Sequence, residues 1–171
     1  MKNTNTIKAF LSVAIISLFA VNAFAQDGTD QATVTASANI LEALSIDTST
    51  DLDFGDLFPG GTETIASDAA EAASFEISGD DGAEITAHFS TLEDLTGGGD
   101  PITVTYEAIS NTTDDTGTAT AFTDVTASQT TNLSGTGELY IWLGGSITAA
   151  AGQATGSYTG DIILDVSYTS I

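Results

Sequence analysis

The chain has 171 residues with 24 acidic side chains, two lysines, no arginine and no cysteine, and its formal net charge is −22 at pH 7. A chain with so few basic groups cannot neutralise phosphates, which excludes nucleic acids and anionic lipid surfaces as partners. Without cysteine there are no disulfides, so stability must come from a hydrophobic core or from partner subunits.

Residues 1–25 have the pattern of a secretory signal peptide. Lys2 and Lys8 precede an apolar run from Ala9 to about Val21 that is too short for a comfortable membrane span, and Ala-Phe-Ala at residues 23–25 is a small-residue cleavage site. We therefore expect an exported protein that begins near Gln26, with no membrane segment in its mature form. All 24 acidic residues and neither lysine remain after cleavage, so the mature formal charge is −24.

The first element predicted in the mature chain is an alternating strand at residues 32–40, whose apolar side is formed by Ala32, Val34, Ala36, Ala38 and Ile40. Further short strands are predicted at residues 52–61, 73–78, 83–89, 101–109, 121–127 and 138–145. Glycine, aspartate and asparagine supply turns between them. The only helical candidate, at residues 67–74, is one turn or a loop.

Residues 156–171 predict a long final strand. Its apolar face carries Tyr158, Ile162, Leu164, Val166 and Tyr168, and polar residues such as Asp161 and Asp165 occupy the other face. Many short strands separated by turns predict a single all-β sandwich. The final strand has no predicted successor, so its outer edge would need covering.

The residues that carry catalysis are scarce, and we expect neither an enzyme nor a cofactor. His88 is the only histidine, and its alternation with Ile85, Ala87 and Phe89 predicts a solvent-facing position. Residues 47–56 resemble a calcium loop only superficially, so no metal site is expected. Trp142 and Tyr140 form a candidate sugar-stacking platform, which leaves a calcium- or carbohydrate-binding module as an alternative function.

Residues 32–40 allow two interpretations. They are either the first strand of their own sandwich, or a donor strand that adds to the exposed edge of a neighbouring molecule and fills a groove with its alternate side chains. The pattern favours neither.

Four stretches together resemble a known family: LDFGDLFPGG (52–61), FEISGDDGAEITAHF (75–89), LTGGGDPITV (95–104) and GQATGSYTGDIILDVSY (152–168). They resemble the spore coat protein U-like domains of archaic chaperone-usher pilins, and most of all a sister family of secreted bacterial domains of unknown function. The resemblance implies an immunoglobulin-like β-sandwich that is incomplete and is completed by a donor strand from the next subunit.

The resemblance also assigns roles to particular residues. Ala32, Val34, Ala36, Ala38 and Ile40 would be the donor residues, and Ile162, Leu164, Val166 and Tyr168 would line the acceptor groove. The chain would divide into a signal peptide (1–25), a donor extension (26–40) and a pilin domain (41–171).

The implied function is that of a structural subunit of an extracellular filament on the bacterial surface, with a role in adhesion or biofilm. Its partners would be further copies of itself, a periplasmic chaperone and an outer-membrane usher. The alternative from the residues alone is a self-contained monomeric surface or matrix domain.

Overall fold

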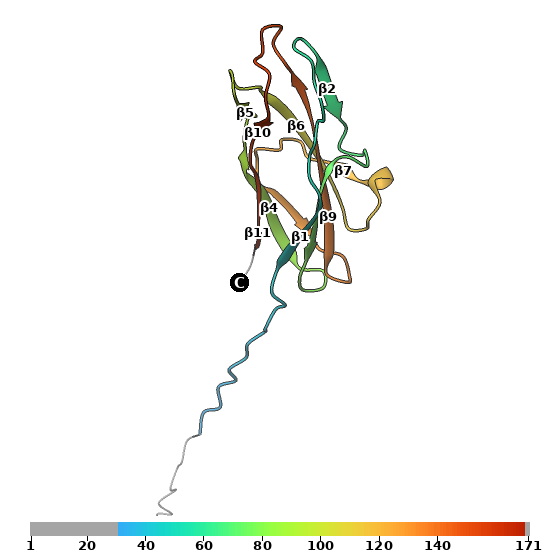
Figure 1. Cartoon of the computed structure of the whole chain (residues 1–171). Helices are drawn as coiled ribbons and strands as arrows, with labels where there is room; N and C mark the ends of the chain where they lie inside the picture. The colour runs from blue at the N-terminus through green and yellow to red at the C-terminus, as the bar shows by residue number, and fades with distance from the viewer. Residues whose placement is uncertain (1–30, 170–171) are drawn as a thin grey trace, which may run out of the picture. The chain divides into compact units, whose positions relative to one another are not determined.

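The computed structural model describes residues 31–169, and the predicted signal peptide lies outside this range. Short antiparallel strands make up the fold (Figure 1), together with one short 3-10 helix at Thr116–Thr118. The strands are β1 (Ser45–Thr50), β2 (Thr62–Ile65), β3 (Ala73–Ser78), β4 (Glu84–Leu92), β5 (Thr96–Gly97), β6 (Val104–Asn111), β7 (Thr120–Ala121), β8 (Gln129–Asn132), β9 (Glu138–Thr148), β10 (Tyr158–Thr159) and β11 (Ile162–Tyr168).

The strands form two main sheets. The larger has the order β1-β3-β9-β6-β7, and β2 pairs with β9 beyond the end of β3. The smaller has the order β11-β4-β8, and β10 pairs with β5 as a separate two-stranded ribbon. Every pairing is antiparallel. The predicted all-β class is confirmed.

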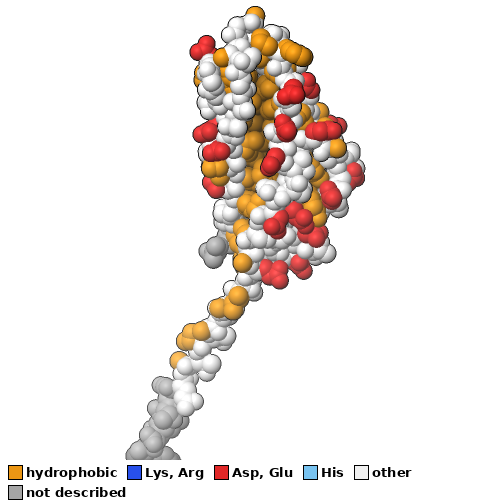
Figure 2. All heavy atoms as spheres, in the orientation of Figure 1, with side chains coloured by type: hydrophobic (Ala, Val, Ile, Leu, Met, Phe, Trp, Pro, Cys, Tyr) orange, Lys and Arg blue, Asp and Glu red, His pale blue; other side chains and the backbone are white. Residues whose placement is uncertain are grey.

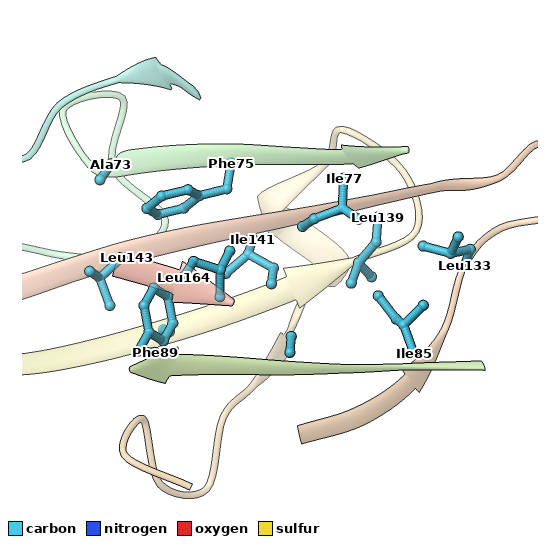
Figure 3. Packing of buried hydrophobic residues seen from close by; sticks show 12 residues of the cluster. Ala73, Phe75, Ile77, Ile85, Phe89, Leu133, Leu139, Ile141, Leu143 and Leu164 are labelled. Atoms are coloured by element: carbon cyan, nitrogen blue, oxygen red, sulfur yellow. The ribbon is translucent and has the colours of Figure 1, made fainter. Parts of the chain in front are cut away.

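The core lies between the inner faces of the two main sheets (Figure 3). Phe75 on β3 meets Phe89 on β4 in an edge-to-face arrangement, with ring centroids 5.9 Å apart. Alternate residues of β9 contribute three of the largest fully buried side chains, Leu139, Ile141 and Leu143. Each buried side chain of this size stabilises the fold by about 1.5–3 kcal/mol relative to its exposed state. The alternating sequence pattern therefore places one face of each strand in a shared core.

The strand predicted at 73–78 coincides with β3, and those predicted at 83–89, 101–109, 138–145 and 156–171 overlap β4, β6, β9 and β10–β11. The predicted turn or loop at 67–74 is a turn that leads into β3, with Ala72 N–H bonded to Ala69 O.

Two predicted strands are wrong. Residues 52–61 form no strand, because Gly55 adopts a positive φ and Phe58–Gly61 close a turn. In 121–127 only Ala121 belongs to a strand, and Phe122 N–H still bonds to Ala108 O. Beyond it, the Asp124 carboxylate accepts bonds from the backbone and side chain of Thr126 in a turn that ends the extended chain.

Residues 31–44 carry no strand, and the strands begin instead at Ser45. The alternating segment at 32–40 is thus not assigned to a sheet of its own chain. Its proposed role between molecules stays a prediction.

Candidate functional site

Two sheet edges lie on the same side of the sandwich. Within residues 31–169, β11 pairs only with β4, and β1 pairs only with β3 in the opposite sheet. The Tyr168 hydroxyl, at the end of β11, donates to Glu42 O just before β1, at 2.7 Å. Figure 1 shows β1 and β11 near each other at this end of the sandwich. The two sheets are therefore open along one common side.

An apolar strip of side chains runs along this open side. Figure 2 shows it as a hydrophobic stripe lying between rows of polar and acidic atoms. We call it the apolar seam and define it by half-buried residues that pack against the core, on β11, at the end of β4 and next to β1: Leu44, Leu52, Leu92, Ile162, Val166 and Tyr168. An apolar surface of this kind is where a further strand would complete a sandwich.

The structure places the four predicted groove residues together on the inner face of β11. Leu164 is buried and lies opposite Phe89 of β4, and Val166 lies opposite Ala87. Ile162 and Tyr168 are half-buried at the two ends of the strand. The alternation read from the sequence is therefore confirmed, while the register shifts between Ile163 and Leu164, so that β4 bulges there.

The five predicted donor residues are exposed and lie outside any strand. The exposed fraction is 88% for Val34 and 92% for Ile40, the two bulkiest of the set. Large apolar side chains on an extended, unpaired segment present both a hydrophobic face and free backbone groups. The segment thus offers the two features that strand addition requires.

Hydrogen bonds to Glu93 fix the Ile162 end of β11. The Glu93 N–H bonds to Asp161 O, and the Glu93 carboxylate accepts the Asp161 N–H at 3.1 Å. The Tyr106 hydroxyl donates to Glu93 O at 2.6 Å. Burial, with smaller contributions from the Asp94 and Glu93 charges, raises the pKa of Tyr106, so this hydroxyl keeps its proton to higher pH than an exposed tyrosine does.

The other end of β11 is fixed by Tyr168. Its hydroxyl accepts the Asp80 N–H at 2.8 Å while donating to Glu42 O. Glu42 N–H in turn approaches the Asp80 carboxylate at 3.4 Å. Glu42 and Asp80 are 126 and 88 residues from Tyr168, so no local sequence signal predicted these contacts. They anchor the point where the exposed segment joins the domain, and we call Leu41 and Glu42 the tail root.

Replacing Tyr168 with phenylalanine tests this anchor. The substitution keeps the ring in the seam but removes both hydrogen bonds, and we expect a loss of about 1–2 kcal/mol in the free energy of unfolding measured with urea. Tyr140→Phe is the matched control, because the Tyr140 hydroxyl makes only a 3.4 Å bond to the Glu76 carboxylate, and the expected loss is under about 0.5 kcal/mol. Equal losses in the two variants would show that Tyr168 is not an anchor.

The residues considered for other chemistry are placed differently from the predictions. Trp142 is only 7% exposed and packs with Ile65 and Ala72, so its ring cannot serve as a sugar-stacking platform. His88 is half-buried rather than fully solvent-facing. It lies opposite Asp165, and its Nδ1 has no hydrogen-bond partner among the described residues.

The remaining features of the described residues are the acidic side chains and two open pockets. Between residues 31 and 169, no three or more histidine, aspartate or glutamate side chains gather in a group able to hold a metal ion. One open pocket of about 340 Å³ between β7 and β8 is lined by hydroxyl, amide and apolar side chains. A second, of about 390 Å³, has Asp100 as its only ionisable side chain.

The comparisons with known proteins give a family but no activity. No helix within residues 31–169 is long and apolar enough to cross a membrane. None of the curated proteins matches the chain. A family model described as a domain of unknown function, DUF4402, matches residues 44–168, a range that begins just after the tail root and ends at Tyr168. The chain belongs to this DUF4402 family.

Proposed function

We propose that this protein is a structural subunit of an extracellular filament, assembled by donor-strand exchange between identical copies. Residues 32–40 of one copy pair with the free edge of β11 in the next, and their apolar side chains lie in the apolar seam. The observation that carries the proposal is the open side of the sandwich, where an apolar-faced edge strand has no second neighbour within the described residues.

The added strand is held mainly by its backbone. Three of the five donor residues are alanines, which bury little area, so Val34 and Ile40 provide most of the apolar contact. Each backbone hydrogen bond along the seven residues of β11 contributes about 0.5–1.5 kcal/mol. A rigid acceptor lowers the entropic cost of docking, and both ends of β11 are fixed by hydrogen bonds. A full ladder thus compensates for the small side chains.

The charge distribution is compatible with this mode of assembly. Copies carrying 24 acidic residues and no lysine or arginine repel one another, and no lysine or arginine of a mature copy can form an ion pair that offsets that repulsion. Backbone pairing and apolar burial need no opposite charge. Salt at 0.1 M weakens the repulsion between charges that are more than about 10 Å apart. Assembly should therefore be favoured at moderate ionic strength.

The proposal includes the export route, the assembly partners and the cellular role that the resemblance implies. The mature protein is exported through the periplasm, where a chaperone covers the seam until an outer-membrane usher passes the subunit to the growing filament. The domain is an immunoglobulin-like sandwich completed by the donor, and the filament acts in surface adhesion or biofilm.

Deleting residues 26–40 tests the proposed function. We expect the full mature chain to form long filaments visible by electron microscopy, and the shortened chain to remain monomeric or bound to its chaperone. Circular dichroism in the near ultraviolet checks that the shortened chain retains its packed core. Filaments from the folded deletion variant, or a stable monomer from the full chain at high concentration and salt, would contradict the proposal and support the self-contained domain.

A further inference from the structure

A second exposed apolar feature lies away from the seam. Phe58 is 84% exposed, although its neighbour Leu57 packs into the cluster of Ile102, Val104 and Ile147. The loop that carries Phe58 is ordered by hydrogen bonds: Gly61 N–H bonds to Phe58 O at 2.8 Å, and Gly60 N–H bonds to Ala149 O at 3.1 Å. The ring is therefore held outward by a fixed turn, where its burial against a partner would be favourable.

The Phe58 loop and the tail root lie at opposite ends of the sandwich. β11 runs from Ile162, next to β10, to Tyr168, which contacts the tail root. The Phe58 loop contacts the residues after β9 and precedes β2. Figure 1 shows β2 and β10 at one end, with the start of β1 and the end of β11 at the other.

The tail root provides no free linker between the candidate donor residues and their own domain. Ile40 is the last donor residue, Leu41 is already half-buried, and Glu42 is hydrogen-bonded through both its N–H and its carbonyl. Wherever Ile40 docks on an acceptor, the donor's own domain must therefore lie directly beside that point.

This constraint fixes the direction in which copies can propagate. A donor strand parallel to β11 places Ile40 at the Tyr168 end of the acceptor, next to the acceptor's own tail root. Each copy can then donate its strand to the other, which gives a closed dimer. A donor antiparallel to β11 places Ile40 at the Ile162 end. The tail root of the donor copy then meets the opposite end of the acceptor's sandwich, and this head-to-tail contact can repeat to form a filament.

We propose that the Phe58 loop is the surface on which the next copy is seated, with the Phe58 ring packed against Ile40 and Leu41 of the incoming tail root. This inference rests on the proposed function. Ile40 and Phe58 are two of the most exposed large apolar residues, and head-to-tail docking buries them together. The turn keeps the ring pre-positioned, so the contact forms with little loss of conformational entropy.

Cysteine cross-linking of the full chain tests the contact without background, because the chain contains no cysteine. The double variant Ile40→Cys with Phe58→Cys is expected to give a ladder of covalent multimers on a denaturing gel after mild oxidation. Each single variant should give dimers at most. The matched pair Ile40→Cys with Asp81→Cys places the second thiol in the exposed turn at the tail-root end and should give no ladder.

The outcomes separate this inference from the proposed function. Filaments of the double variant without a ladder, or a ladder from the Asp81 pair, would overturn the Phe58 contact while leaving donor-strand exchange in place. Absence of filaments from the unmodified chain would overturn both. As a second readout, Phe58→Ser is expected to raise the protein concentration needed for assembly by about 10- to 100-fold. An unchanged concentration would contradict the contact, and an unchanged urea midpoint of the unassembled variant excludes a folding defect.

Discussion

Replacing Val34 with aspartate is expected to abolish filament formation. In a donor strand, Val34 faces the apolar seam, so the substitution would bury a carboxylate in a mature chain that has no lysine or arginine to pair with it. The side chain is 88% exposed in the single copy, and the domain should therefore fold as before. Negative-stain electron microscopy and sedimentation at fixed salt would measure the loss.

Thr35→Asp provides the matched control. It adds the same charge one residue further along the chain, and alternate residues of a strand face opposite sides, so this carboxylate would remain in water. We expect filaments from Thr35→Asp at a somewhat higher salt concentration, because each copy carries one more negative charge. Equal assembly of the two variants would show that residues 32–40 do not add as a strand with the predicted face.

The largest effect on folding stability is expected from Gly137→Ala. Gly137 has φ +77°, and a Cβ there would collide with the carbonyl of Gly79, whose N–H bonds to Gly137 O. The strained backbone and the collision together should lower the free energy of unfolding by about 3–5 kcal/mol, enough to unfold a marginally stable domain. Urea denaturation followed by circular dichroism measures the change.

Gly82→Ala separates the two causes. Gly82 lies in a neighbouring turn with φ +67°, but an added Cβ meets nothing within 4 Å. Only the backbone term remains, and the expected loss is about 1–2 kcal/mol. A loss for Gly137→Ala no larger than that for Gly82→Ala would mean that the Gly79 turn moves aside without cost.

The strands with clear alternation could be read from the sequence, because their periodicity records a buried face directly. β3, β4 and β9 carry apolar residues at every second position, and these residues form the core. The segment at 52–61 was misread because Leu52, Phe54 and Leu57 also alternate in part. Each packs individually against the sandwich while Gly55 and the Phe58–Gly61 turn keep the backbone out of a sheet.

Strands without apolar alternation could not be predicted from the sequence. β8, with the sequence QTTN, is almost wholly polar and exists because β4 offers it a paired edge. β1 is mostly exposed and is held by β3. Trp142 showed the same limitation, since the alternation did not reveal that Ile65 and Ala72 would cover its outer face. In each case a neighbour distant in sequence decides the outcome.

The sequence by itself determined the all-β class, the acidic charge and the apolar faces of the strands, since these depend on composition and a two-residue period. Only the tertiary structure decided that β11 and β1 border one open side, that Tyr168 anchors the tail root, and that Phe58 is held outward at the far end. These arrangements depend on contacts between residues up to 126 positions apart, and closure of the sandwich is what brings them together.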